Sequence, residues 1–260
     1  MKTMLTVLTT LGGRAATKTL CRGADGTVIK APAAMCRLFD FRREPIEDIS
    51  DLACVLEQLA ADPCSFVIRG EPCPGIDLRR PVRRLKYADG DSPPTFRSSV
   101  HGERWICCDF DKVPRIAGVD PIHDPESALS TLTWLLPAEF HGVSFWGQFS
   151  SSAGLDGWRT MSAHLWFMLS DPVTDDDLNA WAANADIPID RRLFNAVQPH
   201  YTAAPILDGI DDPIRRRCCL VEGAFDDVPL DFKPSGPTRT CAPAAQRAAS
   251  KAMENVVVAR

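Results

Sequence analysis

The chain has 260 residues, of which 45% are hydrophobic and 24% charged, and its formal net charge is −5. This composition is typical of a globular protein and excludes a collagen-like or wholly disordered chain. The negative charge excludes attraction of nucleic acid by the surface as a whole, so any such binding has to come from local patches. No stretch approaches the roughly 20 apolar residues that span a bilayer, and the N-terminus lacks a secretory signal. We therefore expect a cytoplasmic protein with no membrane partner.

The first hundred residues are predicted to form an N-terminal α/β subdomain. Residues 1–35 show no sustained period, which predicts a short strand or a loose lead-in. Apolar residues recur every three or four positions over 44–61, which predicts an amphipathic helix with Pro45 in its first turn. Residues 65–69 have the pattern of a strand, and the five prolines within 70–94 predict a loop.

A second unit, over 101–232, is predicted to be the catalytic core. Its expected elements are, in chain order, a strand over 104–111, a helix over 125–136 capped by Asp124, strands over 141–150 and 162–169, a helix over 174–184 opened by Thr174, and a strand over 201–207. This β-α-β-β-α-β order predicts an α+β fold with an RRM-like sheet, two helices on one face and an open opposite face. Residues 233–260 are expected to be a tail or linker.

An Asp-x-Asp pair ends the first strand of this unit. Because side chains alternate along a strand, Asp109 and Asp111 should share one face while Phe110 points to the other. Two close carboxylates repel each other unless a cation lies between them, and magnesium or manganese prefers such oxygen ligands. The alternative is a solvated strand end without function.

Three further features could belong to the same site. His164 and Ser162 should share a strand face, where both could bond phosphate oxygens, although a structural histidine is an equal alternative. The serine and glycine turn over 150–154 could hold a triphosphate or be an ordinary loop. Asp190 could supply a third carboxylate or simply cap a helix over 191–197.

Taken in order, the Asp-x-Asp, Ser-x-His and apolar-Asp motifs resemble those of the archaeo-eukaryotic primase superfamily, the primase-polymerases. The resemblance covers roughly residues 104–207. The segment SSSAGLDGWRTMSAHLWFML is similar to the second-motif region of phage and plasmid members, and DRRLFNAVQPHYTAAP is similar to the segment after that region in mobile-element members.

This resemblance implies a DNA primase-polymerase that acts in the replication of a mobile element, phage or plasmid. Asp109, Asp111 and Asp190 would then hold two Mg²⁺ or Mn²⁺ ions for template-directed nucleotidyl transfer. The residues implied as nucleotide contacts are Ser152, Arg159, Ser162, His164 and Arg191. The implied partners are a single-stranded DNA template, a primer and nucleoside triphosphates.

Basic and aromatic residues are candidates for binding the template and the triphosphate. The basic candidates are Arg79, Arg80, Arg83, Arg84, Lys86, Arg191, Arg192, Arg215, Arg216 and Arg217. The candidate stacking platforms are Trp146, Trp158, Trp166 and Tyr201. Ordinary charged surface and ordinary aromatic core are the alternatives.

The chain also departs from the family pattern. None of its ten cysteines has the spacing of a zinc module, which favours primer extension over primer initiation. The size of the chain and the lack of an export signal predict that these cysteines are reduced thiols. It has no P-loop, so a helicase would be a separate domain or protein partner. Two other functions stay open, namely a catalytically inactive primase-like module that binds DNA and a metal-dependent nuclease.

Overall fold

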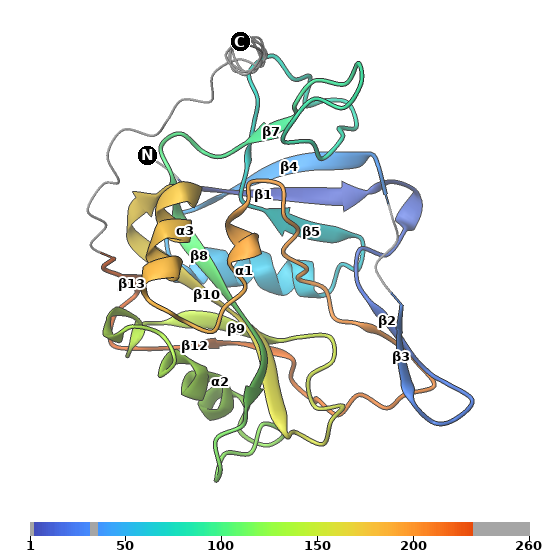
Figure 1. The fold of residues 1–260 in the computed structure, drawn as a ribbon, viewed down its shortest axis with the longest axis vertical. Helices are drawn as coiled ribbons and strands as arrows, with labels where there is room; N and C mark the ends of the chain where they lie inside the picture. Colours follow the sequence, from blue (N-terminus) through green and yellow to red (C-terminus); the bar gives the residue numbers. More distant parts are fainter. Residues whose placement is uncertain (1–2, 32–35, 231–260) are drawn as a thin grey trace, which may run out of the picture.

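The computed structural model of the chain describes residues 3–31 and 36–230, which form a mixed α+β fold (Figure 1). The expected tail over 233–260 lies outside these residues. Within the described part, none of the helices combines the length and the apolar character needed to cross a bilayer.

The N-terminal sheet has the order β4-β1-β5. Its strands are β1 (Thr3–Thr10), β4 (Phe39–Ile46) and β5 (Ser65–Ile68), and both pairings are antiparallel. β1 is longer and more central than the short strand or loose lead-in that we expected. Most of its residues are buried, on both faces, so the alternating pattern that reveals a half-exposed strand is missing from its sequence.

The predicted first helix is confirmed as α1 (Ile49–Ala60), but it begins later than expected. Asp48 caps it by accepting a hydrogen bond from the Asp51 backbone N–H. The prediction of Pro45 in the first helical turn is wrong, since this proline lies on β4 opposite Met4. An edge strand tolerates proline because one side of its backbone needs no ladder partner.

The central sheet has antiparallel strands in the order β12-β9-β10-β8, of which β8 and β10 are long. Its strands are β8 (Glu103–Pro114), β9 (Phe145–Phe149), β10 (Thr160–Val173) and β12 (Cys218–Val221), with the short β13 (Asp227–Val228) parallel to β10. The two predicted helices are confirmed as α2 (Pro125–Thr133), capped by Asp124, and α3 (Asp175–Asn184), opened by Thr174.

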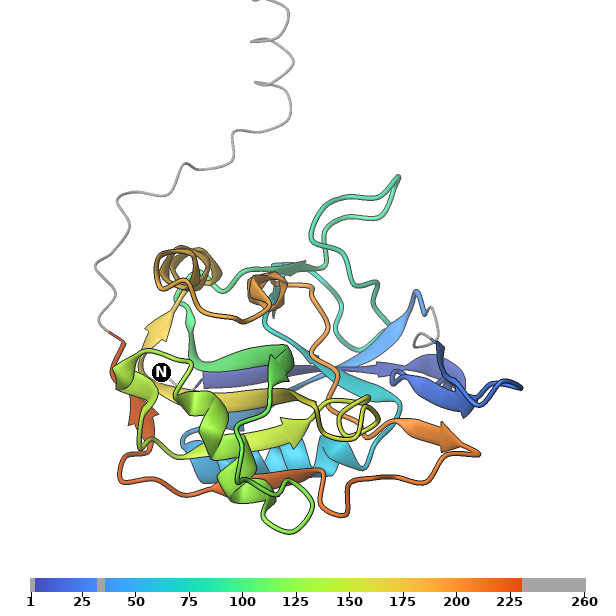
Figure 2. The same ribbon diagram turned by 60° about the horizontal axis from the view of Figure 1, so that its bottom comes forward.

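The predicted last strand over 201–207 was wrong in place and pairing. The strand found there, β11 (Ile206–Asp208), pairs in parallel with β2 (Thr19–Arg22), whose other neighbour is β3 (Val28–Ala31). His200 exchanges both backbone hydrogen bonds with Val67 of β5, so the chain is already tied to the N-terminal sheet before it reaches residue 201. Figures 1 and 2 show β11 and the β2–β3 hairpin side by side at one edge of the molecule. The remaining pair, β6 (Glu71–Pro72) and β7 (Phe96–Arg97), flanks a long loop.

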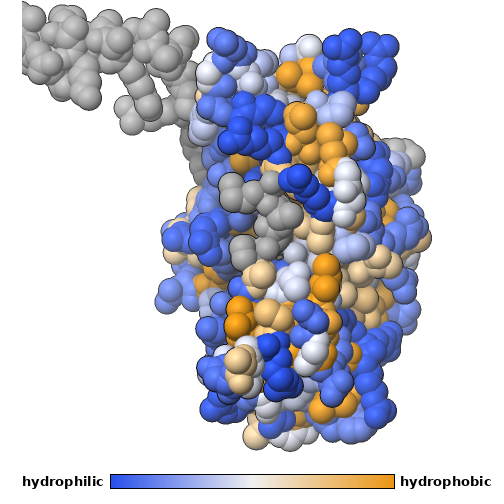
Figure 3. Space-filling model, turned by 90° about the vertical axis from the view of Figure 1, so that its right-hand side faces the viewer, coloured by the Kyte–Doolittle hydropathy of each residue, from blue (hydrophilic) through white to orange (hydrophobic). Residues whose placement is uncertain are grey.

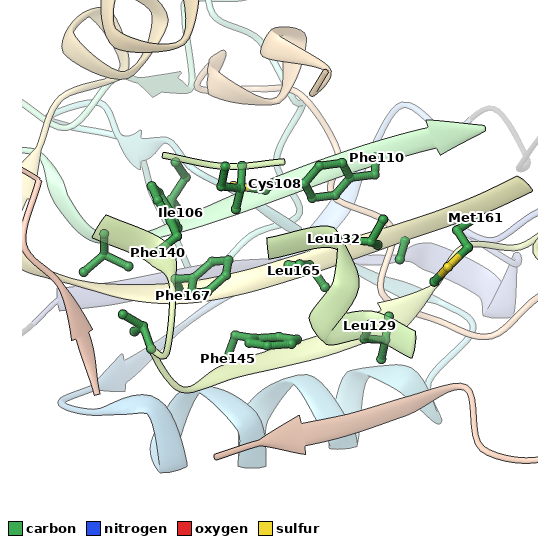
Figure 4. Packing of buried hydrophobic residues seen from close by; sticks show 14 of the residues in the cluster. Ile106, Cys108, Phe110, Leu129, Leu132, Phe140, Phe145, Met161, Leu165 and Phe167 are labelled. Carbon is green, nitrogen blue, oxygen red and sulfur yellow. The ribbon is translucent and has the colours of Figure 1, made fainter. Parts of the chain in front are cut away.

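One face of the central sheet packs against α2 and α3. Ile106, Cys108 and Phe110 of β8 are fully buried there with Leu165 and Phe167 of β10, and α2 covers them with Leu129 and Leu132 (Figure 4). Leu178 and Ala182 of α3 belong to the same cluster.

The opposite face is not open, contrary to our expectation. Trp105, Cys107, Trp146 and Trp166 of that face are buried against residues of β1 and α1. The N-terminal unit and the central sheet therefore share one hydrophobic cluster. This face is covered because its four side chains are apolar, and exposing them to water would cost roughly 25 cal/mol for each Å² of apolar surface.

Candidate active site

A cavity of about 350 Å³ lies where the N-terminal cover of the central sheet ends. Its walls come from β8, β9 and β10, from the turn after β9, from the β2–β3 hairpin and from the segment 190–203. Its charged or imidazole-bearing lining residues are Lys18, Lys30, Asp109, Asp111, His164, Asp190, Arg192 and His200. Asp109, Asp111, Asp190 and His164 were predicted from three separate motifs, and all four line this one cavity.

A row of polar residues crosses the floor of the cavity. His164 of β10 lies in register with Asp109 of β8 on one side and with Gln148 of β9 on the other. The Nε2 atom of His164 is 3.3 Å from Oδ1 of Asp109. Burial acts to raise the pKa of Asp109, but the adjacent His164, together with His200 and Lys18, outweighs it and the pKa is lowered. Asp109 is therefore held as a carboxylate although most of it is shielded from water.

A β-bulge positions Asp111. The register of β8 against β10 shifts here, so that Asp111 and Lys112 together lie opposite Ser162, and Lys112 has a left-handed φ of 55°. The Ser162 hydroxyl accepts a hydrogen bond from the Lys112 backbone N–H at 2.8 Å and donates one to Oδ1 of Asp111 at 3.1 Å. Bulges commonly redirect a side chain beside a functional site. Ser162 thus fixes both the bulge and the carboxylate that it presents.

Asp190 reaches the site through the backbone. Its N–H donates to the carbonyl of Asp109 at 3.0 Å, which places it beside β8. It caps a short 3₁₀ helix, Arg191–Phe194, and its carboxylate accepts from Nε and Nη2 of Arg192 at 2.7–3.0 Å. The hydrogen bond from Arg192 lowers the pKa of Asp190. Asp190 therefore both caps the 3₁₀ helix and lines the cavity, two roles that the sequence presents as alternatives.

The three carboxylates suit a hard divalent cation by their chemistry, since magnesium and manganese prefer such oxygen ligands. They are, however, engaged with His164, with Ser162 and with Arg192 respectively. Over residues 3–31 and 36–230, no three histidine, cysteine or acidic side chains converge as a metal-binding group. To hold a cation, Asp109 and Asp111 would have to bind it from one strand beside His164 and Ser162, and Asp190 would have to exchange Arg192 for the ion.

Only some of the predicted nucleotide contacts line the cavity. His164 and Ser152 line the cavity, as does the rest of the turn over 150–152. Ser162 lies beneath the lining and supports Asp111. Arg159 and Arg191 are not among the lining residues, and the Arg159 guanidinium instead bonds the carbonyl of Asp156 within its own turn. We expected Arg191 to line the cavity, but its neighbour Arg192 in the 3₁₀ helix does so instead.

Five of the ten predicted basic side chains are bound to acids outside the cavity. The loop between β6 and β7 pairs Arg79 and Arg80 with Asp77 and pairs Arg83 with Asp89. Hydrophilic residues gather at that end of the surface in Figure 3. Arg216 and Arg217 pair with Glu126 and Asp212.

The predicted tryptophan platforms were wrong. Trp146, Trp158 and Trp166 are at most 7% exposed because they fill the two hydrophobic clusters on either side of the sheet. Tyr201 is different: it is only half-buried and lines the cavity, and its ring packs against Phe66 with the centroids 5.9 Å apart.

Sequence reasoning missed several cavity residues altogether. Lys18 and Lys30 lie more than 75 residues before the first motif, and Gln148, Gln198 and His200 carry no local pattern. His200 is buried between Trp105 and Trp166, with ring centroids 5.5 and 5.4 Å away, and burial lowers its pKa to about 3. Its two ring nitrogens have no hydrogen-bond partner among the described residues.

Comparisons with protein-family models, with curated proteins and with solved structures each found no match to this chain.

Proposed function

We propose that this protein is a DNA primase-polymerase that carries out template-directed nucleotidyl transfer in the replication of a mobile element, phage or plasmid. The observation that carries the proposal is the meeting of Asp109, Asp111, His164 and Asp190 in one cavity together with cationic side chains. A site for a metal–nucleotide complex needs both carboxylates for the metal and cations for the phosphates.

Each residue has a role in this proposal. Asp109 and Asp111, with Asp190 after its release by Arg192, would hold two Mg²⁺ or Mn²⁺ ions. When bound, such ions supply the Lewis acidity for attack of a primer 3′-hydroxyl on the α-phosphate and for loss of pyrophosphate. His164 and the serines over 150–152 would bond phosphate oxygens. Ser162 keeps Asp111 in place.

The topology supports the proposal without completing the expected RRM-like sheet. The order β8-β10-β9, with α2 and α3 in one cluster on the same face, is compatible with a split βαβ unit that lacks its last strand. Where that strand would pair with β8, the structure has the single backbone bond from Asp190 to Asp109. We propose that this hydrogen bond positions Asp190 beside β8, the task that a fourth strand performs in the complete unit.

Primer extension tests the function directly. Wild type and an Asp109→Asn, Asp111→Asn variant are given a labelled primer on single-stranded DNA, each nucleotide set and Mg²⁺ or Mn²⁺. We expect wild type to extend the primer and the variant to lose about a hundredfold or more in rate, because it has lost its metal ligands. Asp171→Asn, an exposed position further along β10, is the matched control and should extend normally.

A catalytically inactive DNA-binding module is the second candidate. The observation in its favour is that each of the three carboxylates already has a protein partner. It predicts single-strand binding without extension, equal in wild type and in the double variant. A nuclease would instead shorten the labelled strand without added nucleotides, and either result would overturn the polymerase.

A further inference from the structure

The β2–β3 hairpin turns two lysines toward the acidic wall of the cavity. Leu20 of β2 lies opposite Lys30 of β3; Leu20 is fully buried, whereas Lys30 is exposed to solvent and lines the cavity. Lys18 precedes Leu20 by two positions and shares its face of the hairpin. Both lysines line the cavity together with Asp109 and Asp111.

The two lysines are close enough to oppose each other's charge. Burial, followed by the charge and the side chain of Lys18, lowers the pKa of Lys30, while Asp111 acts in the opposite direction. Lys18 in turn contributes to lowering the pKa of Asp109. The cross-strand diagonal that joins positions 18 and 30 is within reach of long side chains.

No acidic side chain of residues 3–31 and 36–230 forms an ion pair with either lysine. Arg192, the remaining cation of the lining, is paired with Asp190. Asp109 and Asp111 offset part of the repulsion between the two ammonium groups, and an anion that bridges the lysines would offset more of it. The hairpin thus presents a preformed site for an anion with several oxygens.

We propose that Lys18 and Lys30 bind the polyphosphate of the incoming nucleoside triphosphate, so that the N-terminal hairpin completes the nucleotide site of the catalytic core. This inference rests on the proposed function for the identity of the ligand. A triphosphate carries several negative charges within a few ångströms, which matches the two adjacent ammonium groups. A phosphodiester of a DNA strand carries one negative charge and needs only one ammonium group. The position opposite Asp109 and Asp111 also suits phosphates that share a metal with those acids.

The test compares two variants that lose the same charge. Lys18→Gln with Lys30→Gln removes the pair, and Arg42→Gln with Arg97→Gln removes two surface cations outside the cavity, each bound to a glutamate. Lys18→Arg with Lys30→Arg keeps both charges. Binding of inorganic tripolyphosphate is measured by calorimetry without metal, binding of a single-stranded oligonucleotide by fluorescence anisotropy, and folding by thermal melting.

We expect the lysine-to-glutamine variant to bind tripolyphosphate about ten to a hundred times more weakly, because it loses two charge-assisted contacts. The arginine-to-glutamine control should match wild type, and the lysine-to-arginine variant should retain most of the affinity. Equal tripolyphosphate affinity in all variants would overturn the inference. So would a loss confined to the oligonucleotide, which would assign the pair to a strand phosphate.

The same variants separate this inference from the proposed function. Tripolyphosphate binding that depends on the lysine pair, in a protein that never extends a primer, would support the anion site and overturn the polymerase. Primer extension with an unchanged nucleotide KM in the lysine-to-glutamine variant would support the polymerase and overturn the lysine site.

Discussion

Two neighbouring rows of residues on one face of the central sheet have opposite properties. The row Cys107, Trp166 and Trp146 is buried against β1 and α1. A second row lies two positions further along the same strands and forms the floor of the cavity; it consists of Asp109, His164 and Gln148. The strands, the face and the register are the same in both rows.

The two rows differ in what packs against them. The apolar row anchors the N-terminal unit, and that unit then provides the opposite wall of the cavity through the β2–β3 hairpin. A sheet face that is half core and half site holds its acids rigidly, because Asp109 is two residues from the buried Cys107 and Asp111 is adjacent to the fully buried Phe110. Changes in the apolar row should therefore affect stability, and changes in the polar row should affect ligands.

The largest effect is expected from Trp166→Ala. Trp166 is fully buried and stacks on Trp105 at 5.4 Å, so truncation leaves a large cavity between the two units. We expect a loss of about 3–5 kcal/mol in the free energy of unfolding, measured by urea denaturation. Trp134→Ala, at a tryptophan that is 69% exposed, is the control and should change it by less than about 0.5 kcal/mol. Equal losses of unfolding free energy in Trp166→Ala and Trp134→Ala would contradict the assignment of the apolar row to stability.

His200 should make stability depend on pH. Burial lowers its pKa in the folded state to about 3, whereas in the unfolded chain it titrates near 6.5. Below pH 6.5 the unfolded chain binds the additional proton, so this contribution is complete above pH 6.5 and is lost as the pH falls toward 3. The loss should approach about 1.4 kcal/mol per pH unit in urea unfolding.

His200→Gln should flatten this slope, because glutamine does not titrate. The control is His123→Gln, at an exposed histidine paired with Asp120, which should leave the slope nearly unchanged. An unaltered slope in His200→Gln would show that other groups cause the acid sensitivity.

His164→Ala should act on the ligand. Because His164 lies in the polar row, we expect its loss to raise the nucleotide KM by about tenfold while the stability changes by less than about 1 kcal/mol. Steady-state primer extension and urea unfolding measure the two quantities. A large loss of stability with an unchanged KM would make His164 a structural histidine.

The smallest effect is expected from Ser162→Ala. It removes the hydroxyl that bonds the Lys112 N–H and Asp111, which should cost about 1 kcal/mol of stability. If the bulge positions Asp111, primer extension should fall in kcat while KM for the nucleotide changes little. Ser162→Thr retains the hydroxyl and should restore part of kcat, whereas a merely structural serine would leave kcat unmoved in both variants.

Local sequence patterns were enough to locate the helices and to relate neighbouring residues. The period of the apolar residues located α1, the capping residues Asp124 and Thr174 located α2 and α3, and strand alternation placed Asp109 and Asp111 opposite Phe110. These features depend on residues only a few positions apart, so their physical causes can be read within a short window.

The cover of the sheet and the distant residues that complete the cavity became known only from the packed chain. Trp105 and Trp166 could as well have lined an open face, and nothing near Lys18, Lys30 or His200 indicates their position beside Asp109. The strand expected over 201–207 failed for the same reason, since the backbone pairing of His200 with Val67 joins segments 133 residues apart. Burial and long-range pairing depend on the whole chain in its folded state, and local patterns do not contain them.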